Sequence, residues 1–326
     1  MFTTRPELAG MFGMVASTHW LATAAGMAVL EAGGNAFDAA VATGFTLQVV
    51  EPHLNGPGGE VPIVLARGDG SEPVVLAGQG VAPAAVTIDA FDDLGLDLVP
   101  GTGLLAATVP AAVPTWLTLL RDHGTLPLGA VLRFAIEYAE NGHPLVTRVS
   151  ATAASVAEHF RAHWPTSAAT WLSSAGEPPA PGQRFGNPVL AGTYRRLLDA
   201  ARGPSREAQI DAVLAAWSTG FVAEAIDVHC RSAVMDDSGR AHAGFLTGAD
   251  LAAWTPSYEP PATLDWHGWT LAKAGTWSQG PVLLQALAML DGVEPAHPGQ
   301  PSGNAGIDPD LVHASVEAMK LAMADR

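Results

Sequence analysis

The most constraining feature of the sequence is a pair of neighbouring helical stretches made almost entirely of small and apolar residues. Alanine, leucine and valine recur at helical spacing over residues 21–32, and Gly33-Gly34 then ends the helix. Asn35 has the side chain of an N-cap for a second helix that ends near Pro52. Because alanine and glycine have little side-chain volume, both helices are expected to pack closely against a neighbouring helix or sheet.

The pattern around these helices predicts a mixed α/β (α+β) chain. The predicted strands cover residues 13–17, 61–66, 74–77 and 262–274. The further predicted helices cover 113–123, 128–141, most of 150–227, 282–290 and 311–323, the last starting at an Asp308-Pro309 cap. The hairpin formed by 61–66 and 74–77 is expected to be buried on both faces. We interpret residues 1–326 as a single domain with a helical middle from about 105 to 250.

The charge balance excludes several classes of protein. Thirty-two acidic and 16 basic residues give a net charge of −16, and only 15% of residues are charged while 48% are hydrophobic. A disordered acidic chain has few apolar residues, so a folded chain is predicted. The acidity disfavours nucleic acid and anionic lipid as partners. With no signal peptide and no stretch of ~20 apolar residues, we expect no contact with a membrane.

The single cysteine, Cys230, cannot form an internal disulfide. A lone thiol fits a reducing compartment, so a cytoplasmic location is expected. No motif surrounds it beyond the adjacent His229, which favours a small buried residue over a nucleophile.

A glycine-rich loop, Asn-Gly-Pro-Gly-Gly at residues 55–59, has two interpretations. Successive backbone N–H groups could bind an anion or line an acyl site. The sequence lacks both the Gly-Lys-Ser/Thr of a P-loop and the G-x-G-x-x-G pattern. A structural turn that lets two backbones approach is therefore favoured.

No other motif identifies a catalytic group. His159 and His163 have the i, i+4 spacing of metal ligands, but no H-E-x-x-H motif or nearby third ligand accompanies them. There is no G-x-S-x-G nucleophile elbow, and the adjacency of residues 17–19 (Ser-Thr-His) carries little weight because triads are spatial. We predict no catalytic residue, metal or cofactor in this chain.

Several segments taken in order resemble the N-terminal part of the gamma-glutamyltranspeptidase family. They are GMVASTH at 13–19, GGNAFDAAVA at 33–42, VEPH at 50–53, GPGG at 56–59, APAAVT at 82–87, AENGHP at 139–144, LTGADL at 246–251 and EAMKLAMADR at 317–326. The resemblance covers nearly the whole chain, and the combination is more specific than any single segment.

The resemblance implies an N-terminal-nucleophile hydrolase with an αββα sandwich. Family members are precursors that cut themselves before a threonine, whose free α-amine then activates its own hydroxyl. That threonine lies beyond the EAMKLAMADR-like segment. We therefore expect this chain to be the large-subunit portion, incomplete and inactive without the small subunit that carries the nucleophile. The last predicted helix reaches Arg326 without a C-cap glycine, which favours the same expectation.

The resemblance also points to substrate-binding residues. The family's large subunit has an arginine in a D-G-R-E-x-A-P-like stretch that pairs with the substrate α-carboxylate. Here the stretch at 77–83 places Gln79 at that position, next to Gly78. An amide lacks the charge and the bidentate fork, so a γ-glutamyl substrate would lose a contact of roughly 1.5–3 kcal/mol. Arg67 is the nearest replacement in sequence.

Glu60 is a second departure, because the family usually continues with glycine and an aromatic residue at this point. Its carboxylate could recognise an amine of the substrate or cap local N–H groups.

Three functions compete. The first is a subunit of an enzyme that hydrolyses or transfers an acyl group from a small amide, γ-glutamyl or related. The second is an amidohydrolase or acylase of the same family with non-glutamyl specificity, and the third is a non-catalytic binding homologue. The acyl donor, the acceptor and the oligomeric state stay open.

Overall fold

The computed structural model describes residues 7–293 and 309–326, and their contacts divide into two compact units. One unit comprises Met1–Val61 and Gly78–Pro256, and the other comprises Pro62–Ala77 and Ser257–Arg326. The prediction of one domain over 1–326 stays a prediction.

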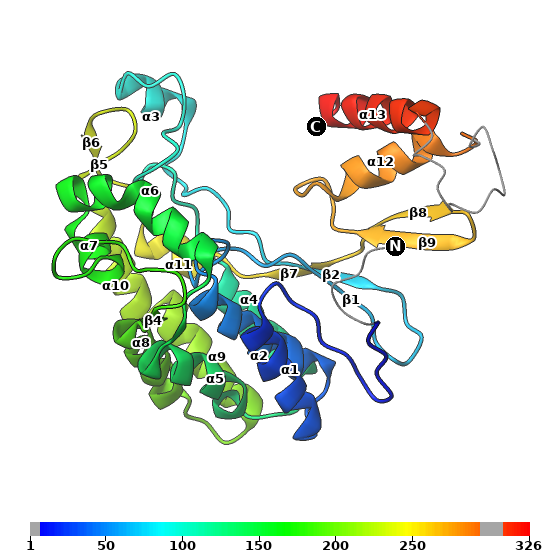
Figure 1. Ribbon diagram of the computed structural model, residues 1–326, viewed down its shortest axis with the longest axis horizontal. Helices are drawn as coiled ribbons and strands as arrows, with labels where there is room; N and C mark the ends of the chain where they lie inside the picture. Colours follow the sequence, from blue (N-terminus) through cyan, green and yellow to red (C-terminus); the bar gives the residue numbers. More distant parts are fainter. Residues whose placement is uncertain (1–6, 294–308) are drawn as a thin grey trace. The chain divides into compact units, whose positions relative to one another are not determined.

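The first unit is mainly helical (Figure 1). Its helices are α1 (Trp20–Glu31), α2 (Ala36–Val50), α3 (Ile88–Asp93), α4 (Ala112–His123), α5 (Leu128–Asn141), α6 (Thr147–His163), α7 (Pro165–Trp171), α8 (Pro188–Ala200), α9 (Arg206–Ser218), α10 (Phe221–Cys230) and α11 (Gly248–Ala253). Two short antiparallel ladders join β3 (His143–Pro144) to β4 (Arg184–Phe185) and β5 (Val234–Met235) to β6 (Ala241–His242).

Helix α2 is the centre of this unit, in contact with α1, α4 and α5. Gly44 of α2 faces the indole of Trp116 on α4 so closely that an added Cβ would overlap the ring. The close packing predicted from the small residues is therefore confirmed, and it depends on the missing side chain at this position.

The GGNAFDAAVA segment fixes the start of α2. Asn35 and Asp38 form a capping box. The buried Asp38 carboxylate also accepts hydrogen bonds from the backbone N–H groups of Thr125 (2.9 Å) and Leu126 (3.1 Å). Asn35 Nδ2 donates to the carbonyl of His123 at 2.7 Å. This part of the segment thus joins α2 to the α4–α5 connection.

Tyr194 fixes α8 against α2. Its ring packs edge-on against Phe45 with centroids 5.6 Å apart, and its hydroxyl donates to Gln48 Oε1 at 2.8 Å. Burial raises the pKa of Tyr194, so the hydroxyl remains a donor. Because Tyr194 faces the core, Arg196, two residues on, lies on a different face of α8.

The described residues of the second unit form two antiparallel sheets and two helices. Strands β1 (Ile63–Leu65), β2 (Val74–Ala77) and β7 (Ser257–Glu259) form one sheet in that order. Strands β8 (Ala262–Trp266) and β9 (Trp269–Lys273) form the other, and helices α12 (Gly280–Leu290) and α13 (Pro309–Ala324) pack together through Val282, Ala286 and Ala322.

Most predicted elements are present, and two expectations are wrong. Residues 13–17 form no strand, because no segment in the described part of the chain pairs with them. The hairpin is not buried on both faces: Val64, on the edge strand β1, is 46% exposed, whereas Val75 on the central strand is fully buried. Asp308, the predicted cap of α13, lies outside the described residues.

Candidate functional site

The glycine loop is a hydrogen-bonded turn that leads directly to α4. Asn55 Nδ2 donates to the carbonyl of Glu60 at 2.8 Å across the loop. The carbonyl of Gly59 accepts from the N–H groups of Ala111 (3.0 Å) and Ala112 (2.8 Å). These N–H groups begin α4, which has no side-chain cap, so Gly59 satisfies donors that the helix leaves free. The loop therefore has the structural role that the sequence favoured.

The predicted site residues lie on two segments that are hydrogen-bonded to one another. Glu60 is exposed and precedes Val61, whose N–H donates to the carbonyl of Gly78 at 2.9 Å. Gly78 is buried, and a Cβ there would overlap the carbonyl oxygen of Val61. Gln79 follows and is exposed. The structure thus brings Glu60, Gly78 and Gln79 into one region, while a substrate-binding role for them stays a prediction.

A third segment runs beside Gln79. A Cβ on Gly80 would overlap the carbonyl oxygen of Val109, and the Val109 N–H donates to the carbonyl of Val81 at 3.0 Å. The segment at 78–81 is therefore held by backbone contacts on both sides, and the side chain of Gln79 is its exposed polar group.

Two further family-like segments meet nearby. Asp250, in LTGADL, accepts from the N–H of Ala84, in APAAVT, at 2.9 Å, and it closes a capping box with Thr247. Burial alone raises the pKa of Asp250, but the hydrogen bonds from Ala84 and Thr247 outweigh it and leave that pKa lowered. This carboxylate has a structural role, because it anchors the irregular segment that follows Gln79.

A partly buried polar cluster lies where α1 begins and α2 ends. The Thr18 hydroxyl donates to the Glu51 carboxylate, and Nδ1 of the buried His19 accepts from the N–H of Leu21 at 3.1 Å. Burial lowers the pKa of His19, while Glu51 opposes that shift. Because His19 Nδ1 caps α1, it is not available to activate Thr18 or Ser17, and the adjacent Ser-Thr-His does not form a triad.

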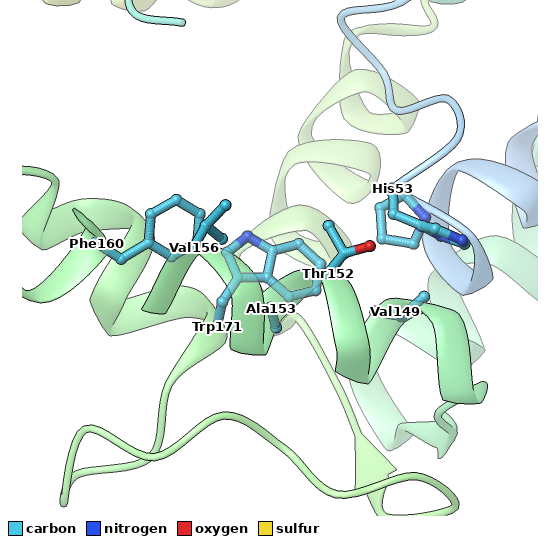
Figure 2. A pocket seen from close by; sticks show the side chains of 8 residues that line it. His53, Val149, Thr152, Ala153, Val156, Phe160 and Trp171 are labelled. Carbon is cyan, nitrogen blue, oxygen red and sulfur yellow. The ribbon is translucent and has the colours of Figure 1, made fainter. Parts of the chain in front are cut away.

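His53, which follows this cluster, lines a small apolar cavity of about 170 Å³ beside α6 and α7. Figure 2 shows His53 and Thr152 at one end and Phe160 at the other, with Trp171 between them. Both ring nitrogens of His53 are buried without a hydrogen-bond partner among the described residues. Within residues 7–293 and 309–326, His53 therefore has no hydrogen-bonded carboxylate or hydroxyl for acid–base chemistry.

A larger groove of about 750 Å³ lies between α8, α10 and the segment at 104–110. Its lining residues are Gly58, Leu104, Ala107, Thr108, Pro110, Val189, Gly192, Thr193, Arg196, Phe221, Val222, Ala225, Ile226, His229, Cys230 and Leu246. Gly58 belongs to the glycine loop, and Thr108 and Pro110 flank Val109, which contacts Gly80. The groove is thus adjacent to the segments that hold the predicted site residues.

Arg196 is the charged residue of this groove, and the sequence reasoning missed it. Its guanidinium carbon lies over the ring of Phe221, 3.9 Å from the ring centroid. Val189, Thr193 and Arg196 recur at helical spacing on one face of α8, and this pattern was the signal available in the sequence.

The other candidates have structural interpretations. The rings of His159 and His163 lie 5.2 Å apart, but across residues 7–293 and 309–326 no group of three potential metal ligands comes together. Cys230 is buried. Its burial, and to a lesser extent the negative charge of the nearby Asp227, raise the pKa of its thiol and so disfavour the thiolate. None of the helices described is both long and apolar enough to cross a bilayer.

A profile of the gamma-glutamyltranspeptidase family matches residues 22–326. The chain therefore belongs to this family, as the sequence resemblance predicted.

Among characterised relatives, the oxamate amidohydrolase proenzyme of Klebsiella pneumoniae is 33% identical over 96% of this chain and 54% of its own length. The solved structure of LmbA2991HD is 57% identical with a TM-score of 0.92, over all of this chain and 54% of that one. Gamma-glutamyltranspeptidase of Helicobacter pylori is 28% identical with a TM-score of 0.83, over 98% of this chain and 85% of that one.

These structural likenesses confirm the predicted fold class, the large-subunit portion of an N-terminal-nucleophile hydrolase. The chain spans about half the length of the oxamate amidohydrolase proenzyme and of LmbA2991HD.

Proposed function

We propose that this chain is the large-subunit part of a gamma-glutamyltranspeptidase-family enzyme that hydrolyses or transfers the acyl group of a small amide. The nucleophile is proposed to lie in a small subunit of the same precursor, outside residues 1–326. Family membership, the coverage of about half of LmbA2991HD and the proenzyme name of the Klebsiella relative support this proposal. The chain alone is expected to be inactive.

The acyl group is proposed to differ from γ-glutamyl, and the observation that carries this proposal is Gln79. By the sequence resemblance it occupies the position of the family's carboxylate-binding arginine, and it is the exposed polar group of a segment whose backbone is held on both sides. An amide there offers neither a charge nor a bidentate fork to an α-carboxylate. The name of the Klebsiella relative supports a non-glutamyl acyl group, because the acyl group of oxamate is oxalyl and not γ-glutamyl.

The test compares Gln79→Arg with the parent in the complete, processed enzyme. The ratio of kcat/KM for γ-glutamyl-p-nitroanilide to that for an uncharged acyl-p-nitroanilide should rise about tenfold, because a guanidinium–carboxylate pair is restored. Gln79→Lys is the matched control, with the charge but not the fork, and a smaller gain is expected. An unchanged ratio in both variants would contradict the proposed role of Gln79.

Inactivity of the isolated chain is tested separately. Residues 1–326, purified alone, are incubated with the same donors and with oxamate. Turnover that persists through a second purification would show that this chain holds a nucleophile of its own.

A further inference from the structure

We propose that the groove between α8 and α10 binds an organic carboxylate with an apolar, unbranched body, and that Arg196 binds its carboxylate. This proposal concerns binding alone, so it stands whether or not the enzyme acts on γ-glutamyl donors.

The state of Arg196 indicates an anionic ligand. Arg196 is the only arginine or lysine among the residues that line the groove. No ion pair of Arg196 is found in the part of the chain that the structure describes, although the protein carries twice as many acidic as basic residues. The guanidinium of Arg196 instead contacts the ring of Phe221, so its charge is available to a ligand of opposite sign.

The contact with Phe221 leaves the N–H groups of Arg196 available to such a ligand. The guanidinium carbon lies 3.9 Å from the centroid of the Phe221 ring, and the N–H groups of the planar guanidinium point outward from that carbon. Edge N–H groups are those that bind a carboxylate through two parallel hydrogen bonds. Phe221 also limits the motion of the long side chain, so less rotamer entropy is lost when the anion binds.

The rest of the groove suits an apolar body. Side chains of Leu104, Val222, Ile226 and Leu246 line it beyond Phe221. The eight-residue separation of Phe221 and His229 along α10 corresponds to about 12 Å at 1.5 Å per residue. An alkyl chain of medium length therefore fits between the Arg196 end and the exposed His229 end.

The experiment measures binding to the complete, processed enzyme by isothermal titration calorimetry, with octanoate as the probe. Acetate carries the charge without the chain, and octanamide carries the chain without the charge. Octanoate should bind at least tenfold more tightly than either one, because both halves of the groove are used.

Arg196→Gln should weaken octanoate binding about tenfold, as expected for the loss of a charged hydrogen-bonded contact. Arg195→Gln is the matched control: it removes the same charge one residue away, on a side chain that pairs with Glu140 and not with the groove. Arg196→Lys, which keeps the charge, should lie between Arg196→Gln and the parent, and circular dichroism establishes that each variant is folded. Equal affinities in the two glutamine variants, or octanoate binding no tighter than acetate, would overturn the proposal.

Discussion

Replacing Asp38 by asparagine should destabilise the protein by about 3 kcal/mol, because Asp38 is a buried carboxylate whose oxygens only accept. Oδ1 accepts from the N–H groups of Thr125 (2.9 Å) and Leu126 (3.1 Å). Oδ2 accepts from the N–H of Asn35 (2.9 Å) and from the Thr125 hydroxyl (2.7 Å). The side chain is fully buried, so water cannot replace a lost partner.

The magnitude follows from these four contacts. In asparagine one oxygen becomes an NH₂ donor, which leaves at least one backbone N–H facing another donor. The Thr125 hydroxyl can rotate to accept, but the N–H of Asn35 or of Leu126 cannot. Leaving a buried N–H donor without an acceptor costs roughly 1–3 kcal/mol. The remaining hydrogen bonds are no longer made to a charged carboxylate, which costs about 1 kcal/mol more. The sum is centred near 3 kcal/mol.

Urea denaturation of the complete protein, followed by circular dichroism, measures this change as a lower unfolding midpoint. Asp93→Asn is the matched control, because it removes the same charge from an exposed position on α3 and should change the free energy of unfolding by less than ~0.5 kcal/mol. If Asp38→Asn falls within that range as well, the hydrogen bonds of Asp38 do not stabilise the fold and the reasoning is refuted.

Three further outcomes are expected. Gly80→Ala should lower the melting temperature of the protein much more than Gly68→Ala does. A Cβ at position 80 would overlap the carbonyl oxygen of Val109, whereas a Cβ at position 68 has no neighbouring atom within contact distance. His19→Asn keeps an N-cap acceptor and removes a histidine whose pKa is lowered by burial in the folded protein. As pH falls, the histidine of the unfolded chain is protonated before that of the folded chain. The free energy of unfolding of the parent should therefore fall more steeply than that of the variant below pH about 6.5. Amide hydrogen exchange over 309–324 should be faster in residues 1–326 alone than in the full precursor, because α13 exposes Val316 (50%) and Met319 (47%); equal protection would show that α13 needs no further surface.

The helices of this protein could be predicted because their signals are local. The first two follow from small residues, a terminating Gly33-Gly34 and the Asn35 cap, all within a few positions of one another. The partner of Asp38 could not be predicted in this way, because Thr125 lies 87 residues further along the chain. The failed strand at 13–17 has the same cause: an apolar segment shows that a strand is possible, but a ladder requires a partner that only the fold supplies.

The candidate site could likewise be predicted only in part from the sequence. Glu60, Gly78 and Gln79 could be named from the family resemblance, and the structure places them on neighbouring segments. The Arg196 groove could not be named, because its walls come from α8, α10 and the segment at 104–110, which are far apart in sequence. Periodicity marks Arg196 as sharing a face with Val189, but it does not reveal Phe221 beneath its guanidinium.

The residues that identify the family are therefore not those that we propose to bind a substrate. Asn35 and Asp38 in GGNAFDAAVA and Asp250 in LTGADL have their polar groups bound to the backbone of this chain, which explains why such residues are useful for building the fold. A substrate requires groups that the fold leaves unused. Gln79 and Arg196 are exposed groups of this kind, and one departs from the family pattern while the other belongs to no motif. Membership of the family thus supports the proposed class of chemistry, and we propose that the acyl group is selected by exposed positions such as these two.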